Sequence, residues 1–361
     1  MSRFPEKIPF PTGLGTAGIG KYDEVIDVRS PSEFLEDHIS GAINLPVLDD
    51  EERAQVGTTY KRVSSFDARK EGAALVTKNI SAHLQSHFAD KPKDYQPLVY
   101  CWRGGQRSGS LATVLSDIGW NVHLIEGGYK SYRSHVLETF ETAAKQLKLV
   151  VLNGYTGAGK TLVLKALEKM GAQILELEGM ANHKGSVFGG DPDFPQPAQK
   201  RFESLIYDSM SGFDLEKIVF VEAESAKIGR LNLPNPLWQR MKTAPVIEVF
   251  SPLSARATYL TADYEEWIGD PGRIEATLDR LTGFHSGERI AHWKALSREA
   301  KWHELVSGLL EFHYDERYTV GGSGHFEAPV ERVDLNDHST EEVEKAAEEL
   351  VRKGEAVAAN P

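Results

Sequence analysis

Residues 149–161 of this chain read Leu-Val-Val-Leu-Asn-Gly-Tyr-Thr-Gly-Ala-Gly-Lys-Thr. The apolar run at 149–153 predicts a strand, and the loop after it fits the pattern G-x-x-x-x-G-K-[ST]. Apolar residues then recur at helical spacing, which predicts a helix over residues 161–170: Val163, Leu164, Leu167 and Met170. A strand, a glycine loop and a helix in this order are typical of a phosphate-binding loop in a parallel α/β domain.

The chemistry expected of this loop is that of a diphosphate cradle. Backbone N–H groups at the start of the helix would donate to phosphate oxygens, and Lys160 would add a positive charge. The hydroxyl of Thr161 would typically ligate Mg²⁺, and no other metal ligand is assigned. The predicted diphosphate-binding residues are Gly154, Gly157, Gly159, Lys160 and Thr161.

Two carboxylates close another apolar strand of the same half, expected over residues 217–221. Either Glu222 or Glu224 would serve as the acid on the metal side of a phosphate site. A salt bridge or a helix cap explains each of them equally well. The sequence does not choose between the two.

Strands and helices alternate through the rest of the chain, which indicates parallel sheets. Further strands are expected at 172–177 and 245–250, a long helix at 289–310, and a last helix after the capping-box pattern of Ser339 to Glu342. The first half repeats the alternation, with strands expected at 24–28, 97–101 and 122–125, a further apolar stretch at 38–45, and a helix over 68–88.

The fold class is therefore α/β, with two domains joined near residues 143–148. We expect an N-terminal extension at 1–21, a parallel-sheet domain at 22–142 and a three-layer α/β/α, kinase-like P-loop domain at 148–320. An acidic segment at 321–361 would add the last strand and helix, either capping the domain or forming a mobile tail. The length of 361 residues suits two domains.

Composition and charge exclude several classes of protein. No run approaches the roughly 18 apolar residues of a membrane helix, and residues 1–11 lack the apolar core of a signal peptide, so we expect a cytoplasmic protein without a membrane partner. The net charge of −12 argues against nucleic acid as a partner. However, residues 327–361 hold ten acidic and four basic residues, whereas residues 225–302 hold eleven basic and nine acidic ones. A locally basic face is compatible with that distribution.

The first domain carries the only cysteine, Cys101, at the start of the loop CWRGGQRS (101–108). No internal disulfide or C-x-x-C motif can form. The loop lies between a strand end and a helix start, where free N–H groups, the helix dipole, Arg103 and Arg107 all favour a thiolate. The same cradle would hold a terminal sulfide or selenide. A buried structural cysteine is the alternative, and the two arginines and two glycines around Cys101 argue against it.

The first half resembles a rhodanese domain. The resemblance rests on VIDVRSPSEF (25–34), HISGAIN (38–44), the Cys101 loop and EGGY (126–129), which occur in rhodanese order. It implies that Cys101 carries a persulfide or perselenide, and that the loop is braced by Asp27 and Arg29 together with Gly104, Gly105 and Ser108. One departure is Asp37, which stands where rhodanese patterns usually have Gly before the histidine. We expect this departure to affect only the local loop.

The combination of the two halves resembles the tRNA 2-selenouridine synthase family. The strings that carry this resemblance are LDDEERAQVGTTYK (48–61), YCWRGGQRS (100–108), LEGMANHKGS (177–186) and EAES (222–225), and it extends from about residue 22 to about residue 320. It implies geranylation of a 2-thiouridine at the tRNA wobble position by geranyl diphosphate. Selenium from selenophosphate then replaces the S-geranyl group. The tRNAs for Lys, Glu and Gln are the implied acceptors, and no tightly bound cofactor is expected.

Under this resemblance Cys101 is the selenium-carrying nucleophile, with Arg103 and Arg107 stabilising its anion. The segment after the second strand of the P-loop half would lie near the substrate, as in P-loop kinases, and Arg256 and Arg280 would close over the diphosphate. The substrate-side residues are Asn182, His183, Lys184, Ser186, Arg230 and Arg256. A packed loop histidine is the alternative for His183. The geranyl chain needs an apolar groove, but aromatic residues such as Phe188, Phe194, Trp238 and Trp267 are more often core and are not assigned.

Two groups of basic residues would contact RNA phosphates. One is Lys227, Arg240 and Lys242, near Arg230; the other is Lys294, Arg298 and Lys301, at i, i+4 and i+7 on one face of the long helix. An ordinary solvated helix face explains the second group equally well.

Two other functions remain open at this point. A P-loop small-molecule kinase or NTPase fused to a sulfurtransferase would turn over ATP without RNA. A sulfur or selenium relay protein without catalytic activity would load Cys101 and pass its cargo to a partner.

Overall fold

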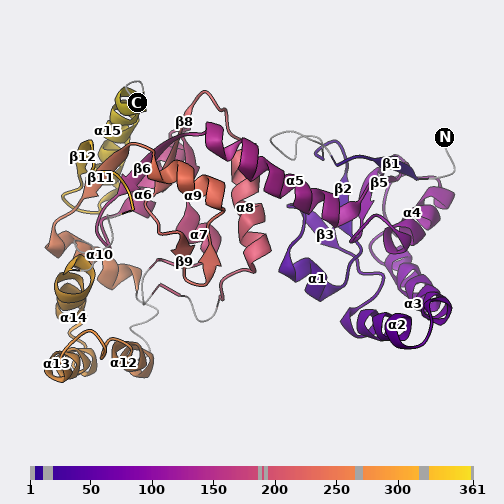
Figure 1. Ribbon diagram of the computed structural model, residues 1–361, viewed down its shortest axis with the longest axis horizontal. Helices are drawn as coiled ribbons and strands as arrows, with labels where there is room; N and C mark the ends of the chain where they lie inside the picture. Colours follow the sequence, from indigo (N-terminus) through magenta and orange to yellow (C-terminus); the bar gives the residue numbers. More distant parts are fainter. Residues whose placement is uncertain are drawn as a thin grey trace. The chain divides into compact units, whose positions relative to one another are not determined.

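The computed structural model describes residues 5–10, 19–185, 189–190, 194–264, 271–316 and 325–358, which divide into two compact units (Figure 1). The first unit comprises residues 1–142 and 197–212, and the second comprises residues 143–196 and 213–361. Each unit is built around a five-stranded sheet whose paired strands are all parallel, so the expected α/β class is confirmed. Within the described ranges, no helix is both long and apolar enough to span a membrane.

The sheet of the first unit has the order β1-β5-β4-β2-β3, and Cys101 follows its central strand directly. The outer strand β1 comes from the segment expected to be an N-terminal extension, and it pairs with β5. The apolar stretch at 38–45 contributes only the three residues of β3. The strands are β1 (Glu6–Ile8), β2 (Glu24–Asp27), β3 (Ala42–Asn44), β4 (Pro97–Tyr100) and β5 (His123–Ile125).

Most helices of the first unit follow the sheet strands in sequence, but the last one comes from far along the chain. The chain leaves the second unit at Gln196, contributes this helix, α8, to the first unit, and returns at Phe213. There α8 packs against α5 (Figure 1). The helices are α1 (Pro31–Glu36), α2 (Asp50–Arg62), α3 (Ser65–Gln85), α4 (Gln106–Ile118), α5 (Gly128–Thr142) and α8 (Gln199–Ser211).

The second unit has the sheet order β12-β11-β6-β8-β7, so the strand that leads into the phosphate-binding loop is central. A short antiparallel pair, β9 and β10, lies apart from this sheet. The strands are β6 (Lys148–Asn153), β7 (Gln173–Leu175), β8 (Ile218–Glu222), β9 (Lys227–Ile228), β10 (Leu231–Asn232), β11 (Val246–Phe250) and β12 (Glu331–Asp334).

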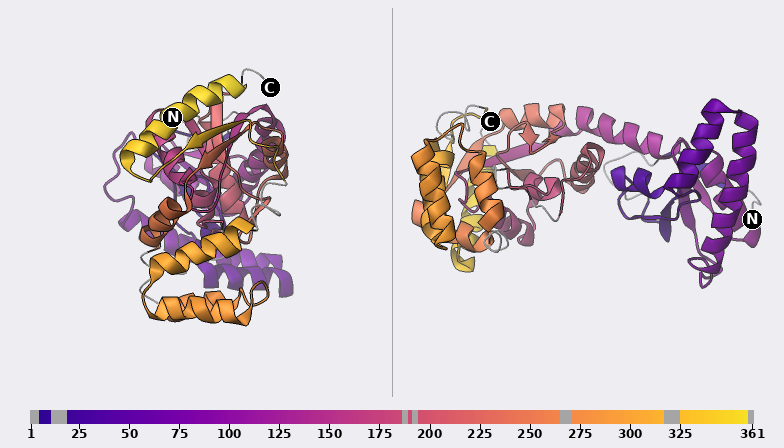
Figure 2. Two further views of the ribbon diagram at one scale, coloured as in Figure 1. Left: turned by 90° about the vertical axis from the view of Figure 1, so that its left-hand side faces the viewer. Right: turned by 90° about the horizontal axis from the view of Figure 1, so that it is seen from below.

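Helices α6 and α15 pack together on this sheet, where Val150, Leu164 and Leu350 share one buried core. The acidic C-terminal segment is therefore part of the second unit and not a tail: β12 pairs with β11, and α15, yellow in Figure 2, packs beside α6. The predicted start of α15 is confirmed, although the side chain of Glu342 binds Asn336 instead of completing the capping box. The helices are η2 (Ala144–Gln146), α6 (Lys160–Lys169), α7 (Leu177–Ala181), α9 (Asn235–Lys242), α10 (Leu253–Asp263), α12 (Pro271–Asp279), α13 (Gly287–Arg298), α14 (Trp302–Leu309), the π-helix η3 (Leu310–Asp315) and α15 (Thr340–Ala358).

The single helix expected over 289–310 is wrong. Ala300 has a left-handed φ of 55°, which ends α13, and the chain restarts as α14 before the π-helix η3. Helices α12 to α14 form a separate apolar cluster around the buried Trp293, drawn in orange in Figure 2. The turn at Ala300 lets both helices bury apolar faces in this cluster.

Candidate functional site

The sulfur of Cys101 lies in a cradle of hydrogen-bond donors at the start of α4. The backbone N–H of Gly105 lies 3.3 Å from Sγ, and the hydroxyl of Ser108 donates to it at 3.2 Å. Cys101 is buried. Gly104 makes the loop possible: its φ is +62°, and a Cβ there would lie 2.6 Å from the carbonyl oxygen of Ile125. The cradle therefore favours an anionic sulfur or selenium at this position.

The two arginines of the loop have different positions. Arg103 is exposed. Arg107 forms an ion pair with Glu33, with Nη1 at 2.5 Å and Nη2 at 3.2 Å from the carboxylate oxygens. Burial acts to raise the pKa of Glu33, but the hydrogen bond from Arg107 outweighs it and lowers the pKa. The structure thus gives Arg107 a partner on α1, while the hydrogen bonds to Sγ come from Gly105 and Ser108.

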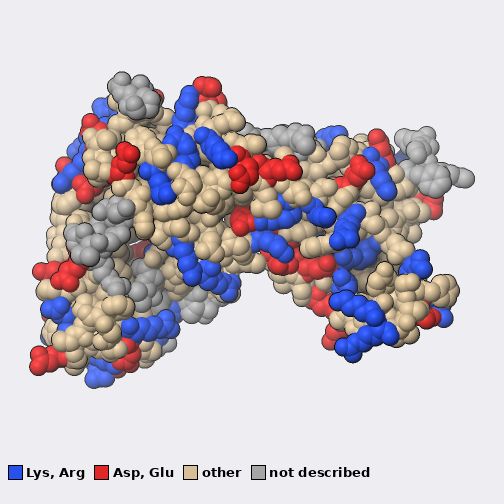
Figure 3. Space-filling model, viewed as in Figure 1, with Lys and Arg blue, Asp and Glu red and all other residues tan. Residues whose placement is uncertain are grey.

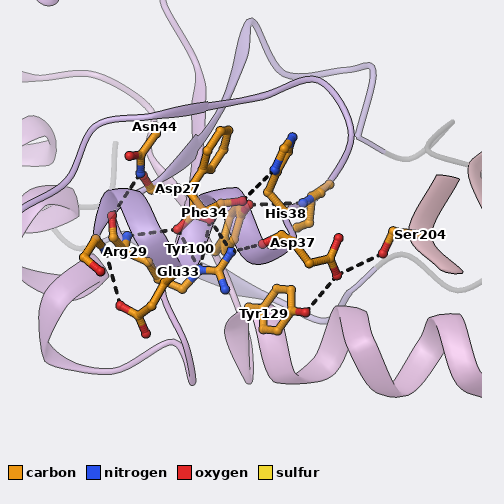
Figure 4. Close-up of polar contacts among 12 residues, drawn as sticks. Asp27, Arg29, Glu33, Phe34, Asp37, His38, Asn44, Tyr100, Tyr129 and Ser204 are labelled. Carbon is orange, nitrogen blue, oxygen red and sulfur yellow. Dashed lines mark hydrogen bonds and ion pairs between the residues drawn. The ribbon is translucent and has the colours of Figure 1, made fainter. Parts of the chain in front are cut away.

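Asp27 and Arg29, which the resemblance predicts to support the cysteine loop, form a buried ion pair (Figure 4). Arg29 donates from Nε to Asp27 Oδ2 at 2.9 Å and from its backbone N–H to Oδ1 at 2.9 Å. Its guanidinium lies 4.0 Å from the ring centroid of Tyr129. The backbone N–H of Tyr129 in turn donates to the carbonyl of Cys101 at 2.8 Å. The pair is thus connected to the cysteine through one aromatic residue.

Asp37 is the centre of this network, so the expectation that it affects only a local loop is wrong. Its backbone carbonyl accepts from Arg29 at 2.6 Å, and its Oδ2 accepts from the hydroxyls of Tyr129 at 2.8 Å and Ser204 at 2.9 Å. Burial and the Asp37 carboxylate raise the pKa of Tyr129, so this hydroxyl stays a donor. Figure 4 shows Asp37 between Tyr129 and Ser204. A glycine at this position would have no side-chain oxygen to accept from Tyr129 and Ser204.

Further side chains of α8 contact the same region. Lys200 pairs with Glu36 at 2.8 Å, and its ammonium lies 5.9 Å from the ring centroid of Trp102, the residue after Cys101. Asp208 accepts a hydrogen bond from Ser40, and burial raises its pKa to about 6. Sequence reasoning missed α8, because no local pattern connects it to the cysteine loop.

The phosphate-binding loop has the expected form in the second unit. Lys160 begins α6, and its Nζ donates to the carbonyl of Gly154 at 2.9 Å. Gly157 has a φ of +77°, and a Cβ there would lie 2.7 Å from Leu260 Cδ1. The loop borders a cavity of about 420 Å³, and all five predicted diphosphate-binding residues line it: Gly154, Gly157, Gly159, Lys160 and Thr161.

The two carboxylates at the end of β8 differ in position. Glu224 lines the cavity, whereas Glu222 is 1% exposed beneath it and accepts from the backbone N–H of Glu178 at 2.6 Å. Burial and the neighbouring Glu178 raise the pKa of Glu222 to about 8, and they raise the pKa of Glu224 well above its usual value. Of these two, Glu224 is therefore the carboxylate that a ligand in the cavity would meet.

Sequence reasoning missed two further acidic residues of this cavity, Glu176 and Glu178. They follow β7, and the carboxyl end of β7 lies beside that of β8 in the parallel sheet. That adjacency is the signal that could have found them, because ligands of α/β sheets bind at the carboxyl ends of strands. Among the described residues, no group of three or more histidine, cysteine or acidic side chains could hold a metal ion.

Three of the predicted substrate-side residues, Asn182, His183 and Lys184, line the same cavity. Lys184 pairs with Asp263 at 2.6 Å. His183 accepts at Nδ1 from the N–H of Gly185 at 3.1 Å, and burial lowers its pKa. Ser186, with Phe188 and Trp267, lies outside the described residues. Arg230 is not among the cavity-lining residues: it is exposed and binds Gln196.

Arg256 lies directly behind the phosphate-binding loop. It is 4% exposed, donates to both carboxylate oxygens of Asp315 at 2.9 and 2.7 Å, and reaches the carbonyl of Thr156 at 3.2 Å. These contacts anchor the loop from behind. Arg280, the other residue expected to close over the diphosphate, is exposed just after α12.

The predicted basic helix face is wrong. Lys294 and Arg298 lie on α13, but Lys301 follows the break at Ala300 and is the N-cap residue of α14. All three are paired with acids: Lys294 with Asp279 at 2.6 Å, Arg298 with Glu275 at 2.7 Å and Lys301 with Glu299 at 2.8 Å.

The three residues of the other predicted basic group, Lys227, Arg240 and Lys242, differ in burial and in their contacts. Arg240 donates to the carbonyl of Leu147 at 2.8 Å, and Lys242 is partly buried at the end of α9. Lys227 is exposed on β9. On the face of the molecule shown in Figure 3, basic and acidic side chains are interspersed over both units.

The fold and the two sites define a class of protein: a rhodanese-like unit with a cradled cysteine, joined in one chain to a P-loop unit. Family models agree with this division. The rhodanese-like domain matches residues 16–135, and the tRNA 2-selenouridine synthase AAA domain matches residues 147–277.

Similar proteins extend across both units. The tRNA 2-selenouridine synthase of Shewanella frigidimarina is 37% identical over 306 residues, which are 84% of this chain and 77% of that protein. Those of Nitrosomonas europaea and Marinobacter nauticus are 36% and 31% identical, over 71% and 80% of this chain and 68% and 83% of those proteins. A crystal structure of the N-terminal domain of a putative ATP/GTP binding protein from Clostridium difficile 630 is 39% identical, with a TM-score of 0.30, and covers 35% of this chain and 99% of that one. This chain belongs to the tRNA 2-selenouridine synthase family.

Proposed function

We propose that this protein modifies the wobble uridine of tRNA in two steps. It first geranylates 2-thiouridine with geranyl diphosphate, and it then replaces the S-geranyl group by selenium from selenophosphate. The relatives named above carry the name tRNA 2-selenouridine synthase, which supports selenation of tRNA as the overall outcome. The expected acceptors are the tRNAs for Lys, Glu and Gln.

The first step takes place at the phosphate-binding loop. The 2-sulfur attacks the first carbon of the geranyl group, the carbon–oxygen bond to diphosphate breaks, and diphosphate leaves with the electron pair. The uridine ring loses its N3 proton to solvent. Lys160 and the N–H groups at the start of α6 stabilise the departing charge without ATP hydrolysis. Thr161 and Glu224, which line the same cavity, would hold Mg²⁺ against the diphosphate oxygens, and the ion would neutralise part of their charge.

The second step uses Cys101. Alkylation makes sulfur a better leaving group, so a selenium nucleophile attacks C2 of the base and expels geranyl thiolate. Selenophosphate supplies the selenium when water cleaves its phosphorus–selenium bond and phosphate is released. We assign Cys101 to this step as the residue that carries selenium. The hydrogen bonds that Gly105 and Ser108 donate to its Sγ would stabilise a negatively charged sulfur or selenium at this position.

The observation that carries the proposal is that one chain of this family holds both a cradled cysteine and a cavity of about 420 Å³ beside Lys160. A fused kinase remains the second candidate, because the loop fits ATP equally well. The two are separated by nucleoside mass spectrometry of a 2-thiouridine RNA incubated with the protein and geranyl diphosphate. S-geranyl-2-thiouridine supports the proposal. An unchanged nucleoside together with ATP consumption supports the kinase.

A further inference from the structure

The cavity beside the phosphate-binding loop has an aromatic and apolar wall that the assigned residues do not use. Tyr259 and Leu260 of α10 line it, together with Tyr264, which directly follows α10, and Tyr314 of η3. All four side chains are partly buried. Of the aromatic residues considered from the sequence, the structure describes Phe194 and Trp238, and neither belongs to this wall.

The wall is packed directly against the loop. Leu260 approaches Gly157 so closely that any side chain there would clash with it. The ring of Tyr259 stacks on His338 with centroids 4.5 Å apart, and His338 Nε2 lies 3.0 Å from the carbonyl of Gly157. A group attached to a diphosphate in the loop would therefore lie next to this wall.

The π-helix η3 contributes both to the aromatic wall and to the support of the phosphate-binding loop. It places Tyr314 in the cavity and the next residue, Asp315, on Arg256, which binds the loop carbonyl of Thr156. π-Helical turns are rare and often occur at functional sites. This one connects the aromatic wall to the phosphate-binding loop through the partly buried ion pair between Asp315 and Arg256.

The ring of Tyr264 also accepts positive charge. The ammonium of Lys184 lies 4.4 Å from its centroid. Displacement of diphosphate from an allylic carbon develops positive charge on that carbon, and an aromatic face stabilises such charge.

We propose that Tyr259, Leu260, Tyr264 and Tyr314 bind the hydrocarbon chain of a prenyl diphosphate whose diphosphate lies in the loop. This inference rests on the proposed function, because it takes the geranyl diphosphate of the first step as the ligand. An apolar chain gains affinity for each methylene that it buries, and the wall offers it aromatic and aliphatic surface next to the leaving group. A nucleoside base stacked on the same tyrosines is the competing occupant.

Isothermal titration of the full chain with geranyl diphosphate, inorganic diphosphate and ADP tests the proposal. The wild type should bind geranyl diphosphate more tightly than diphosphate. Tyr314→Ala should weaken geranyl diphosphate about tenfold and change diphosphate less than twofold. Tyr314→Leu should recover part of the loss, because leucine keeps apolar surface. Tyr264→Leu is a second wall variant should Tyr314→Ala unfold, and Tyr60→Ala, at an exposed tyrosine of the first unit, is the matched control.

The remaining outcomes overturn the proposal in different ways. Tight geranyl diphosphate binding that neither wall variant changes would leave the proposed function intact and place the chain elsewhere. An equal loss for geranyl diphosphate and diphosphate would make the wall a support of the loop only. If ADP binds the wild type more tightly than geranyl diphosphate and loses affinity in Tyr314→Ala, the wall is a nucleoside site and the proposed function itself fails.

Discussion

Ser204 donates a 2.9 Å hydrogen bond to Oδ2 of Asp37, although 167 residues separate them in the chain. The same oxygen accepts from Tyr129, whose backbone holds the carbonyl of Cys101. Helix α8 is thereby an integral support of the cysteine cradle. The chain returns to the rhodanese-like unit to provide it, after it has already formed the phosphate-binding loop.

Ser204→Ala should destabilise the rhodanese-like unit by about 1–3 kcal/mol, because a buried carboxylate oxygen loses one of its two donors. Thermal unfolding measures the effect, which should appear as a lower unfolding midpoint of the rhodanese-like unit than in the wild type. Ser209→Ala, on the same helix but outside the network, should leave the midpoint within about 1 °C of the wild type. Equal midpoints for the two variants would show that the contact contributes nothing.

Ser108→Ala should slow alkylation of Cys101 by iodoacetamide at pH 7 by about tenfold. The substitution removes the hydroxyl that donates to Sγ, and a hydrogen bond to a charged group contributes about 1.5 kcal/mol. Mass spectrometry of the alkylated protein measures the rate. Ser110→Ala, whose hydroxyl binds the backbone of Gln106, is the control on the same helix. An unchanged rate in Ser108→Ala would argue against a role of this donor in stabilising the thiolate.

The stability of the P-loop unit should fall as the pH rises from about 5 to about 8. Burial raises the pKa of Glu222 to about 8 from the ordinary 4.5, so the folded protein keeps a proton that the unfolded chain has already released. Glu222→Gln removes the contribution of Glu222 to this dependence, leaves that of Glu224, and retains an oxygen for the N–H of Glu178. The midpoint of the variant should therefore decline less than that of the wild type.

Glu216→Gln, at a carboxylate that is 86% exposed, is the control for this pH series and should follow the wild type. Parallel curves for Glu222→Gln and the wild type would contradict the assignment of a retained proton to Glu222.

Arg256→Lys should lower stability by about 2 kcal/mol, because lysine cannot bind both oxygens of Asp315 and the carbonyl of Thr156 together. The affinity for diphosphate should also fall, because the phosphate-binding loop loses the hydrogen bond from Arg256 to the carbonyl of Thr156. Chemical denaturation and titration measure the two effects, with Arg280→Lys at an exposed arginine as the control. Weaker diphosphate binding at unchanged stability would instead make Arg256 a direct ligand contact.

Local sequence was sufficient for both loops and for most strands. The glycines and the lysine after β6 determine the conformation of the phosphate-binding loop through contacts within a few residues. The same holds for the short apolar run that forms β4 before Cys101, so both could be predicted from the local sequence. What the sequence could not predict depends on distant contacts. Asp37 looked like a loop substitution because its partner, Ser204, belongs to another half of the chain. Glu178 became visible as a site residue only when β7 and β8 were placed side by side.

The break at Ala300 shows a second limit. Apolar residues continue at helical spacing through this position, and neither glycine nor proline marks an end. Tertiary packing decides instead, since the turn lets α13 and α14 both contribute to the core around Trp293. The basic face predicted from i, i+4, i+7 spacing required one continuous helix. Because the helix breaks at Ala300, Lys301 does not share a helix with Lys294 and Arg298.

The most direct test follows both steps on one RNA. A 2-thiouridine anticodon stem-loop is incubated with geranyl diphosphate, with and without selenophosphate, and its nucleosides are read by mass spectrometry. We predict that the wild type forms S-geranyl-2-thiouridine and then 2-selenouridine, that Cys101→Ala stops at the geranylated nucleoside, and that Lys160→Ala forms neither. If the wild type leaves 2-thiouridine unchanged, or if Cys101→Ala still incorporates selenium at the wild-type rate, the division of the two steps between the cysteine cradle and the phosphate-binding loop is wrong.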